Sequence, residues 1–101
     1  MDEVFVAVAD ATRRRILLLT REGEVAAGEI ATQIPTISRP AVSQHLRVLV
    51  HAGLLDVRRD GSRRLYRLRA EGFAEAAGFL DAMWAARLDD LKREAEKEHR
   101  G

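Results

Sequence analysis

Residues 38–53 read SRPAVSQHLRVLVHAG, and this stretch decides the fold. It predicts one helix over residues 39–52. Ser38 has a side chain suited to capping the helix start, and Pro40 falls in the first turn, where a missing backbone N–H costs nothing. Gly53 follows the last turn, as glycine often does. The apolar residues lie four and three positions apart and therefore share one buried face: Val42, Leu46 and Leu49.

The opposite face of this helix carries small or polar side chains: Arg39, Ala41, Ser43, Gln44 and Arg47. Such a face can enter the major groove of DNA, where large apolar groups would block the approach. Ser43 and Gln44 can donate and accept hydrogen bonds at base edges, and the arginines can reach guanine or phosphate. Ser38 can hold a phosphate as well as cap the helix. His45 fits either a partly buried side chain bonded to backbone or a DNA contact.

Three shorter helices are predicted upstream from the spacing of apolar residues, and they cover residues 2–9, a segment from Asp10 toward Gly23, and residues 26–34. Asp10 can cap the second helix, and Gly23 should end it in the left-handed conformation. Pro35 disfavours continuation of the third helix, so a tight turn follows. The third and fourth helices therefore form a helix-turn-helix unit.

After Gly53 the apolar period changes to two, which predicts a β-hairpin. Leu55 and Val57 alternate with polar residues on the first strand, and Tyr66 and Leu68 face the same way on the second, with a turn at residues 60–61. Arginines line the tip and arms: Arg58, Arg59, Arg63, Arg64, Arg67 and Arg69. This hairpin is interpreted as a wing along the DNA backbone or a neighbouring groove. The alternative is a solvated hairpin whose charges protect an exposed strand edge.

The helical period returns at about residue 70 and lasts to about residue 97. Its apolar residues recur at spacings of four and three: Phe73, Ala77, Leu80, Trp84, Leu88, Leu91 and Ala95. Such a helix extends to roughly 40 Å, beyond the body of a domain this small, so part of its seam must contact another subunit. We therefore expect a homodimer through the first and last helices, with an interface of Phe5, Val8, Phe73, Leu80, Trp84, Leu88 and Leu91.

The net charge of +1 hides an uneven distribution. Residues 1–35 carry a net −2, residues 36–69 a net +6 and residues 70–101 a net −3. All eight cations of the central segment are arginines, whose planar fork suits bidentate contact with phosphate or guanine. A solvated surface would also account for such a run. Its place between two acidic segments favours attraction of phosphates to one face.

Several function classes are excluded or disfavoured. The chain has no cysteine, which excludes disulfides, thiolate metal sites and thiol redox sensing. No apolar stretch approaches the length of a membrane span, and the acidic start of the chain lacks the cations of a secretory signal, so we expect a cytoplasmic protein without a membrane partner. Ser43 and His45 point in different directions, no acidic pair converges and no phosphate-binding glycine loop exists, so no enzyme is predicted.

Four motifs together resemble the ArsR family of winged-helix regulators, which is named for arsenical resistance. They are DATRRRIL at residues 10–17, SRPAVSQHLRVL at 38–49, AGL at 52–54 and RDGSRR at 59–64. The resemblance implies a winged helix-turn-helix fold, mainly α with a two-stranded β-hairpin, as one domain over residues 1–101. It also implies a homodimer that binds a pseudo-palindromic operator in double-stranded DNA and represses transcription. The implied DNA contacts are Ser38, Arg39, Ala41, Ser43, Gln44, His45 and Arg47 in the recognition helix, and Arg58, Arg63 and Arg64 in the wing.

The usual inorganic sensor of that family is missing. Its metal and arsenical sites use cysteine pairs or carboxylate and histidine ligands on the terminal helix, where this chain offers only His99 beside Glu94 and Glu98. A lone terminal histidine is usually solvated, so we expect no metal and no cofactor. No feature identifies a small-molecule effector.

Two local departures concern the helix-turn-helix itself. Ala11 stands where the family usually has proline, and the turn over residues 34–37 is one residue longer than usual, which can alter how the recognition helix is presented. The alternative function is a winged-helix module that binds protein and not DNA. Such a module would need an apolar outer face on the fourth helix, where Ser43, Gln44 and Arg47 lie instead.

Overall fold

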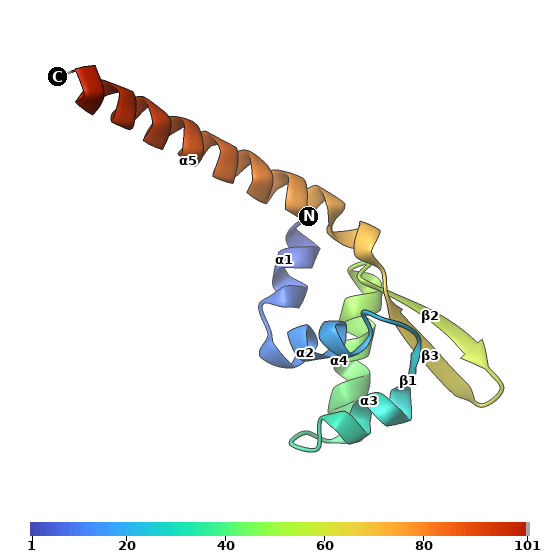
Figure 1. Cartoon of the computed structure of the whole chain (residues 1–101). Helices are drawn as coiled ribbons and strands as arrows, with labels where there is room; N and C mark the ends of the chain where they lie inside the picture. Colours follow the sequence, from blue (N-terminus) through green and yellow to red (C-terminus); the bar gives the residue numbers. More distant parts are fainter. Residues whose placement is uncertain (101) are drawn as a thin grey trace.

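The computed structural model describes residues 1–100, with side chains through residue 98. Figure 1 shows the elements in chain order: α1 (Asp2–Val8), α2 (Ala11–Leu19), β1 (Val25–Ala26), α3 (Ala27–Gln33), α4 (Arg39–His51), β2 (Leu55–Asp60), β3 (Arg63–Leu68), the 3-10 helix η1 (Ala70–Phe73) and α5 (Ala74–Arg100). The prediction of a mainly helical chain with a β-hairpin is confirmed.

The limits of α4 agree with the sequence prediction because the predicted cap, the proline and the terminal glycine all take their expected roles. The Ser38 hydroxyl oxygen accepts a hydrogen bond from the backbone N–H of Ala41 at 3.3 Å. Pro40 lies in the first turn. Gly53 adopts a φ of +78°, the left-handed conformation that ends the helix without steric cost to glycine.

The predicted end of α2 is wrong. The helix stops at Leu19, and a positive φ occurs in the described residues only at Gly53 and Gly61, not at Gly23. Thr20 ends the helix instead, because its hydroxyl donates to the carbonyl oxygen of Ile16 at 3.0 Å. The carbonyl of Thr20 then accepts from the backbone N–H of Leu68 at 3.0 Å, which ties the chain to the sheet before residue 23 is reached.

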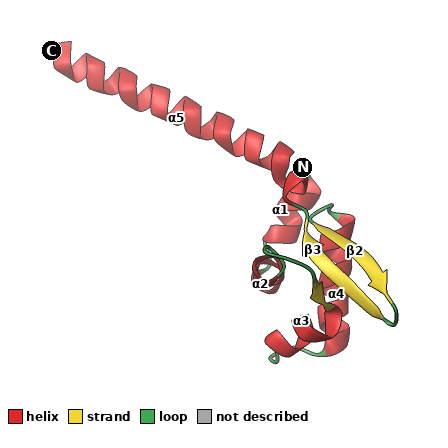
Figure 2. Ribbon diagram, turned by 45° about the vertical axis from the view of Figure 1, so that its right-hand side comes forward, coloured by secondary structure: helices red, strands yellow, loops and turns green. Residues whose placement is uncertain are grey.

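The sheet has a strand that the sequence did not reveal. β1 pairs with β3 in antiparallel register, with Val25 opposite Tyr66 and Ala26 opposite Leu65, so the sheet order is β1-β3-β2. The expected two-stranded hairpin is therefore the larger part of a three-stranded sheet (Figure 2). A two-residue strand is too short to show a period of two, so the sequence pattern did not predict it.

Burial in the hairpin also differs from simple alternation. Leu65 and Tyr66 are adjacent residues of the central strand β3 and both are buried, so both faces of the sheet are covered at this point. Val57 in β2 is exposed, although the alternation placed it inward. The turn lies one residue later than expected: Asp60 pairs with Arg63, and Gly61 takes the positive φ of +62° inside the two-residue loop.

The core lies where the helices meet the sheet. Its largest fully buried apolar members come from α2, α3, α4 and the segment after α4: Ile16, Ile30, Val42, Leu46, Leu49 and Leu54. Each such side chain contributes about 1.5–3 kcal/mol by its removal from water. The predicted buried stripe of α4 is confirmed, and this stripe fixes which face of α4 remains outside.

A tight junction connects the end of α4 to the start of α5. A Cβ atom at residue 72 would collide with the backbone carbonyl of Gly53, so only glycine fits there. Residues 70–73 form the 3-10 helix η1, and the α-helix begins at Ala74, later than the predicted start near residue 70. The close approach of Gly72 to Gly53 accounts for this break in the helical pattern.

The long helix α5 leaves the body as an arm (Figures 1 and 2). The radius of gyration is 18.9 Å, whereas a compact chain of this length would have about 13 Å. The longest extent of the molecule is 69 Å against 26 Å and 23 Å in the other directions. The predicted reach of the helix beyond its own body is confirmed. No helix in residues 1–100 is long and apolar enough to cross a membrane.

Candidate nucleic-acid interface

The outer face of α4 presents the polar side chains that the sequence placed there. Arg39, Ser43, Gln44 and Arg47 are exposed, and Ala41 is half-buried. Arg47 donates a hydrogen bond to the Gln44 side-chain oxygen at 3.3 Å, which leaves the amide NH₂ of Gln44 as the group directed to a partner. This face can offer hydrogen-bond donors, acceptors and charge to the edges of base pairs.

Ser38 lies at the start of this face. Its hydroxyl caps α4 through the bond to Ala41, so the capping interpretation is confirmed. The side chain is also exposed, beside the backbone N–H of Arg39, the first residue of a 13-residue helix. Capping and contact with a phosphate are compatible at this position.

A groove of about 700 Å³ lies between α4 and the hairpin. It is lined by Ser43 and Arg47 from α4 and by Arg63 and Arg64 from β3, together with residues of α3. Three arginines therefore face one carboxylate in this lining, that of Glu29. The structure therefore brings two predicted recognition residues, Ser43 and Arg47, together with the wing residues Arg63 and Arg64 in one basic groove. The other predicted contact residues do not line it: Ser38, Arg39, Ala41, Gln44, His45 and Arg58.

The wing arginines differ in their local partners. The Arg58 guanidinium donates to both carboxylate oxygens of Glu24, at 3.0 and 2.7 Å. The hydrogen bond from Arg58 to Glu24 and the negative charge of Glu24 raise the pKa of Arg58. Arg63 pairs with Asp60 across the hairpin end at 3.2 Å. No hydrogen bond or ion pair forms at Arg64 among the described side chains. Arg58 thus links β2 to the segment before β1, while Arg64 projects at the tip.

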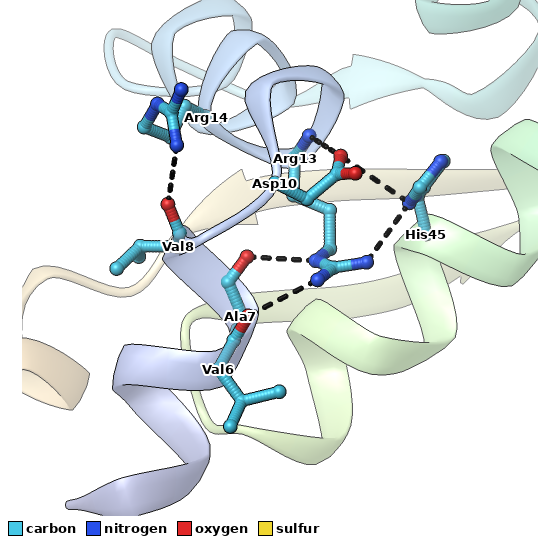
Figure 3. A network of polar contacts seen from close by, with 7 residues as sticks. All are labelled: Val6, Ala7, Val8, Asp10, Arg13, Arg14 and His45. Atoms are coloured by element: carbon cyan, nitrogen blue, oxygen red, sulfur yellow. Dashed lines mark hydrogen bonds and ion pairs between the residues drawn. The ribbon is translucent and has the colours of Figure 1, made fainter.

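His45 is turned away from the polar face and toward α2 (Figure 3). Its Nδ1 atom lies 3.2 Å from Nη1 of Arg13 and 3.8 Å from a carboxylate oxygen of Asp10. The same carboxylate accepts the backbone N–H of Arg13 at 3.0 Å. That bond, assisted by the charge of Arg13, lowers the pKa of Asp10 although partial burial opposes the shift. His45 is bonded to side chains, not to backbone as one interpretation of the sequence had it.

Arg13 of α2 lies behind this face of α4, outside the groove, and its contacts were not predicted from the sequence. Besides His45, its guanidinium contacts two carbonyl oxygens at the end of α1, those of Ala7 at 2.7 Å and Val6 at 3.1 Å. The only signal in the sequence was the Asp10 to Arg13 spacing typical of an N-capped helix. That spacing predicts the backbone bond but not the contacts of the arginine side chain.

The predicted dimer residues fall into two groups. Phe5, Val8 and Phe73 are half-buried against the core cluster, and Phe5 meets Phe79 edge to face with ring centroids 6.1 Å apart. Along the arm the apolar side chains are exposed, with Trp84 64% exposed: Leu80, Trp84, Leu88 and Leu91, and with them Phe79 and Met83, which the sequence seam did not include. One strip of α5 is thus apolar and uncovered in the single chain.

The described side chains, those of residues 1–98, include two histidines, His45 and His51, besides the carboxylates. No group of three or more His, Asp or Glu residues lies close enough there to hold a metal ion. His99, the one histidine of the terminal helix, lies outside the described side chains.

Comparison with known proteins agrees with this geometry. Residues 8–58 match the family model described as a helix-turn-helix domain, which covers α2 through most of β2. The polar outer face of α4, the buried stripe behind it and the basic hairpin beside it define the class: a winged helix-turn-helix DNA-binding regulator of transcription, not an enzyme.

Relatives then give the family. The chain is 45% identical over 87 residues to the HTH-type transcriptional regulator Rv2034 of Mycobacterium tuberculosis, covering 86% of this chain and 80% of that protein. It is 41% identical over 80 residues to the transcriptional repressor SdpR of Bacillus subtilis, covering 79% and 88%. The solved ArsR-like transcriptional regulator from Rhodococcus sp. RHA1 shares 32% identity and a TM-score of 0.76 over 95% of this chain and 90% of that one. The chain belongs to the ArsR family of transcriptional regulators.

Proposed function

We propose that the protein represses transcription by binding, as a homodimer, a pseudo-palindromic operator in double-stranded DNA. The observation that carries this proposal is the single groove lined by α4 and the hairpin, in which three arginines outnumber one carboxylate. Repression is supported by the similarity to SdpR, whose name describes a transcriptional repressor. A dimer of two such faces would present them about one DNA turn apart.

The side chains of α4 divide into proposed roles. Ser43 and Gln44 read base edges, and Arg39 reaches guanine or phosphate at the entrance of the helix into the groove. Arg47 orients Gln44 through their hydrogen bond and contacts the backbone of the DNA. Ala41 permits close approach, since a larger side chain would hold the helix away, and Ser38 offers its capped helix start to a phosphate.

In the wing, Arg63 and Arg64 are assigned to phosphates. Arg58 is assigned to holding the hairpin in place, because both of its contacts are to the Glu24 carboxylate. His45 receives no DNA contact in this proposal, since its ring is engaged by Arg13 and Asp10. Each residue is thus assigned a role according to the groups that its side chain already contacts within the chain.

The proposed dimer uses the apolar strip of α5 together with α1. Leu80, Trp84, Leu88 and Leu91 would bury large apolar areas only against a second copy, because the body of the chain ends before it reaches them. A two-fold axis between antiparallel or crossing α5 arms would place the two α4 helices symmetrically, which is what a pseudo-palindromic site requires.

Fluorescence anisotropy with a selected operator tests the DNA roles. Gln44→Ala should relax sequence preference at its base by about 1–3 kcal/mol, and Arg64→Ala should weaken binding to all sequences and reduce the salt slope by about one. Arg15→Ala is the matched control, because this exposed arginine of α2 lies outside the groove. Unchanged operator affinity in both Gln44→Ala and Arg64→Ala would overturn the assignments.

The competing proposal of a protein-interaction module needs an apolar outer face on α4. No large apolar side chain of α4 is among the exposed ones in the described residues. Selection of bound sequences from random double-stranded DNA decides between the two: enrichment of a pseudo-palindrome supports the operator, and failure to enrich any sequence supports the module.

A further inference from the structure

We infer that Arg13 is a positioning residue, which sets the orientation of the recognition helix α4 relative to α1 and thereby the spacing of the two recognition helices in the dimer. The consequence for spacing rests on the proposed function. The underlying link between the helices belongs to the single chain, where Arg13 of α2 touches both α1 and α4.

The contacts to α1 occupy its last turn. The Arg13 Nε–H donates to the carbonyl oxygen of Ala7 at 2.7 Å, and Nη2 donates to that of Val6 at 3.1 Å. The final carbonyls of a helix lack their usual partner four residues later within the helix, and that of Val6 also accepts the backbone N–H of Ala9 at 3.3 Å. Because the guanidinium is planar and its donors are fixed relative to one another, two such bonds define the direction of the α1 end as well as its distance.

In the contact to α4, the donor and the acceptor of the hydrogen bond can be assigned. Arginine only donates hydrogen bonds, so the 3.2 Å contact from Nη1 requires Nδ1 of His45 to be the acceptor. The ring proton is then on Nε2, and the imidazole in this contact is neutral. One rigid group thus holds three atoms on two helices: the carbonyl oxygens of Val6 and Ala7 and the ring nitrogen of His45 (Figure 3).

The neighbouring Arg14 differs from Arg13 in that it contacts α1 but not α4. It also caps the end of α1, through a bond from Nη1 to the carbonyl oxygen of Val8 at 2.8 Å. Its hydrogen bonding in the described residues does not extend to α4. Removing Arg14 therefore loosens α1 alone, whereas removing Arg13 loosens α1 and separates it from the recognition helix.

The link matters because α1 belongs to the side of the molecule assigned to the dimer. Phe5 of α1 packs edge to face on Phe79 of α5, so the position of α1 follows that of the arm. A change in the angle between α1 and α4 would be repeated by symmetry in the partner subunit. Both recognition helices would then shift relative to the two-fold axis while each retained its own reading face.

The main experiment measures operator spacing. Arg13→Met, Arg14→Met and the unaltered protein are titrated with a single half-site and with operators whose half-sites are moved apart or together by one and two base pairs. Arg13→Met should keep half-site affinity within about twofold and lose about tenfold of its preference for the natural spacing. Arg14→Met should keep that preference.

Two further variants separate positioning from general stability. Arg13→Lys should fail to restore the spacing preference, because one ammonium group cannot reproduce the planar set of bonds. His45→Leu should lose the preference to the same extent as Arg13→Met, and the double variant should be no worse than either single one. Additive losses, or full rescue by lysine, would overturn the inference.

A measurement without DNA keeps this inference distinguishable from the proposed function. Because the chain lacks cysteine, nitroxide labels can be placed by Asp2→Cys in α1 and Gln44→Cys in α4 alone. Arg13→Met should broaden the distance distribution between the labels, and Arg14→Met should broaden it less. An unchanged distribution in Arg13→Met would overturn the inference even if operator binding stands. Absence of any spacing preference in the unaltered protein would instead contradict the proposed dimeric operator.

Discussion

The body of the molecule and the α5 arm use the same kind of apolar side chains in opposite ways. In the body, Leu46 and Leu49 are removed from water by other elements of the chain. In the arm, Leu88 and Trp84 remain exposed although they continue a regular helical seam. The spacing of apolar residues thus identifies the apolar face in both regions. In the body that face is covered by other elements of the same chain, whereas in the arm it is not covered.

Substitution of Trp84 should have the largest effect on this contrast. Trp84→Arg places a charge in the middle of the proposed dimer strip, so we expect a monomer and a fall in operator affinity of at least about a hundredfold, as the two half-sites would no longer be bound together. The body should keep its circular dichroism, because Trp84 lies beyond it. Sedimentation equilibrium at micromolar concentration measures the association.

The control for that substitution is Ala85→Arg, which adds the same side chain one residue further along, on the face of α5 that carries Asp81, Asp89 and Lys92. This variant should remain dimeric. A folded, dimeric Trp84→Arg would contradict the assignment of the exposed strip to an interface.

The second prediction concerns the body. Leu49 has no exposed surface, so Leu49→Ala should lower the free energy of unfolding by about 2–5 kcal/mol. Leu88→Ala removes the same atoms from an exposed position of the arm. In the Trp84→Arg background, where association is removed, Leu88→Ala should change urea-induced unfolding by less than about 0.5 kcal/mol. Equal effects of the two variants would erase the distinction between the regions.

The third prediction addresses the junction. In Gly72→Ala the new methyl group meets the carbonyl of Gly53, and we expect a loss of about 1–3 kcal/mol in the free energy of unfolding. Gly78→Ala, a few residues into α5, has open space around the added carbon. There we expect a gain of about 0.5–1 kcal/mol, since alanine favours helix over glycine. Both are measured in the Trp84→Arg background, and a neutral Gly72→Ala would show that the junction adapts.

Sequence patterns predicted what depends on local chemistry. The limits of α4 follow from Ser38, Pro40 and Gly53, each of which acts on its own turn of helix, and the buried stripe follows from spacing alone. The basic groove was predictable because only ten residues separate residues 39–47 from residues 58–64, so a helix followed directly by a hairpin brings them together. The family resemblance points to the same residues.

The rest depends on contacts between distant segments. β1 exists because β3 offers it a partner some forty residues later, with Val25 opposite Tyr66. The end of α2 was misplaced because the hydroxyl of Thr20, and not a glycine, completes the last turn. Likewise, nothing local to Arg13 indicates that its guanidinium reaches a histidine 32 positions away. Such contacts are set by packing, which a linear pattern does not record.

The smallest predicted effect concerns pH. The pKa of Asp10 is lowered in the folded protein, chiefly by the hydrogen bond from the backbone N–H of Arg13, so the ionised carboxylate stabilises the fold. That stabilisation is fully present above the pKa of the unfolded chain and is lost as the pH falls through the lower folded value. Urea unfolding between about pH 6 and pH 3 should therefore show a shallower loss of stability in Asp10→Asn, which keeps a capping oxygen but cannot titrate. The difference is small because Asp10 is partly exposed, and a parallel pH dependence in both proteins would mean that the network around Arg13 and His45 gains nothing from the charge.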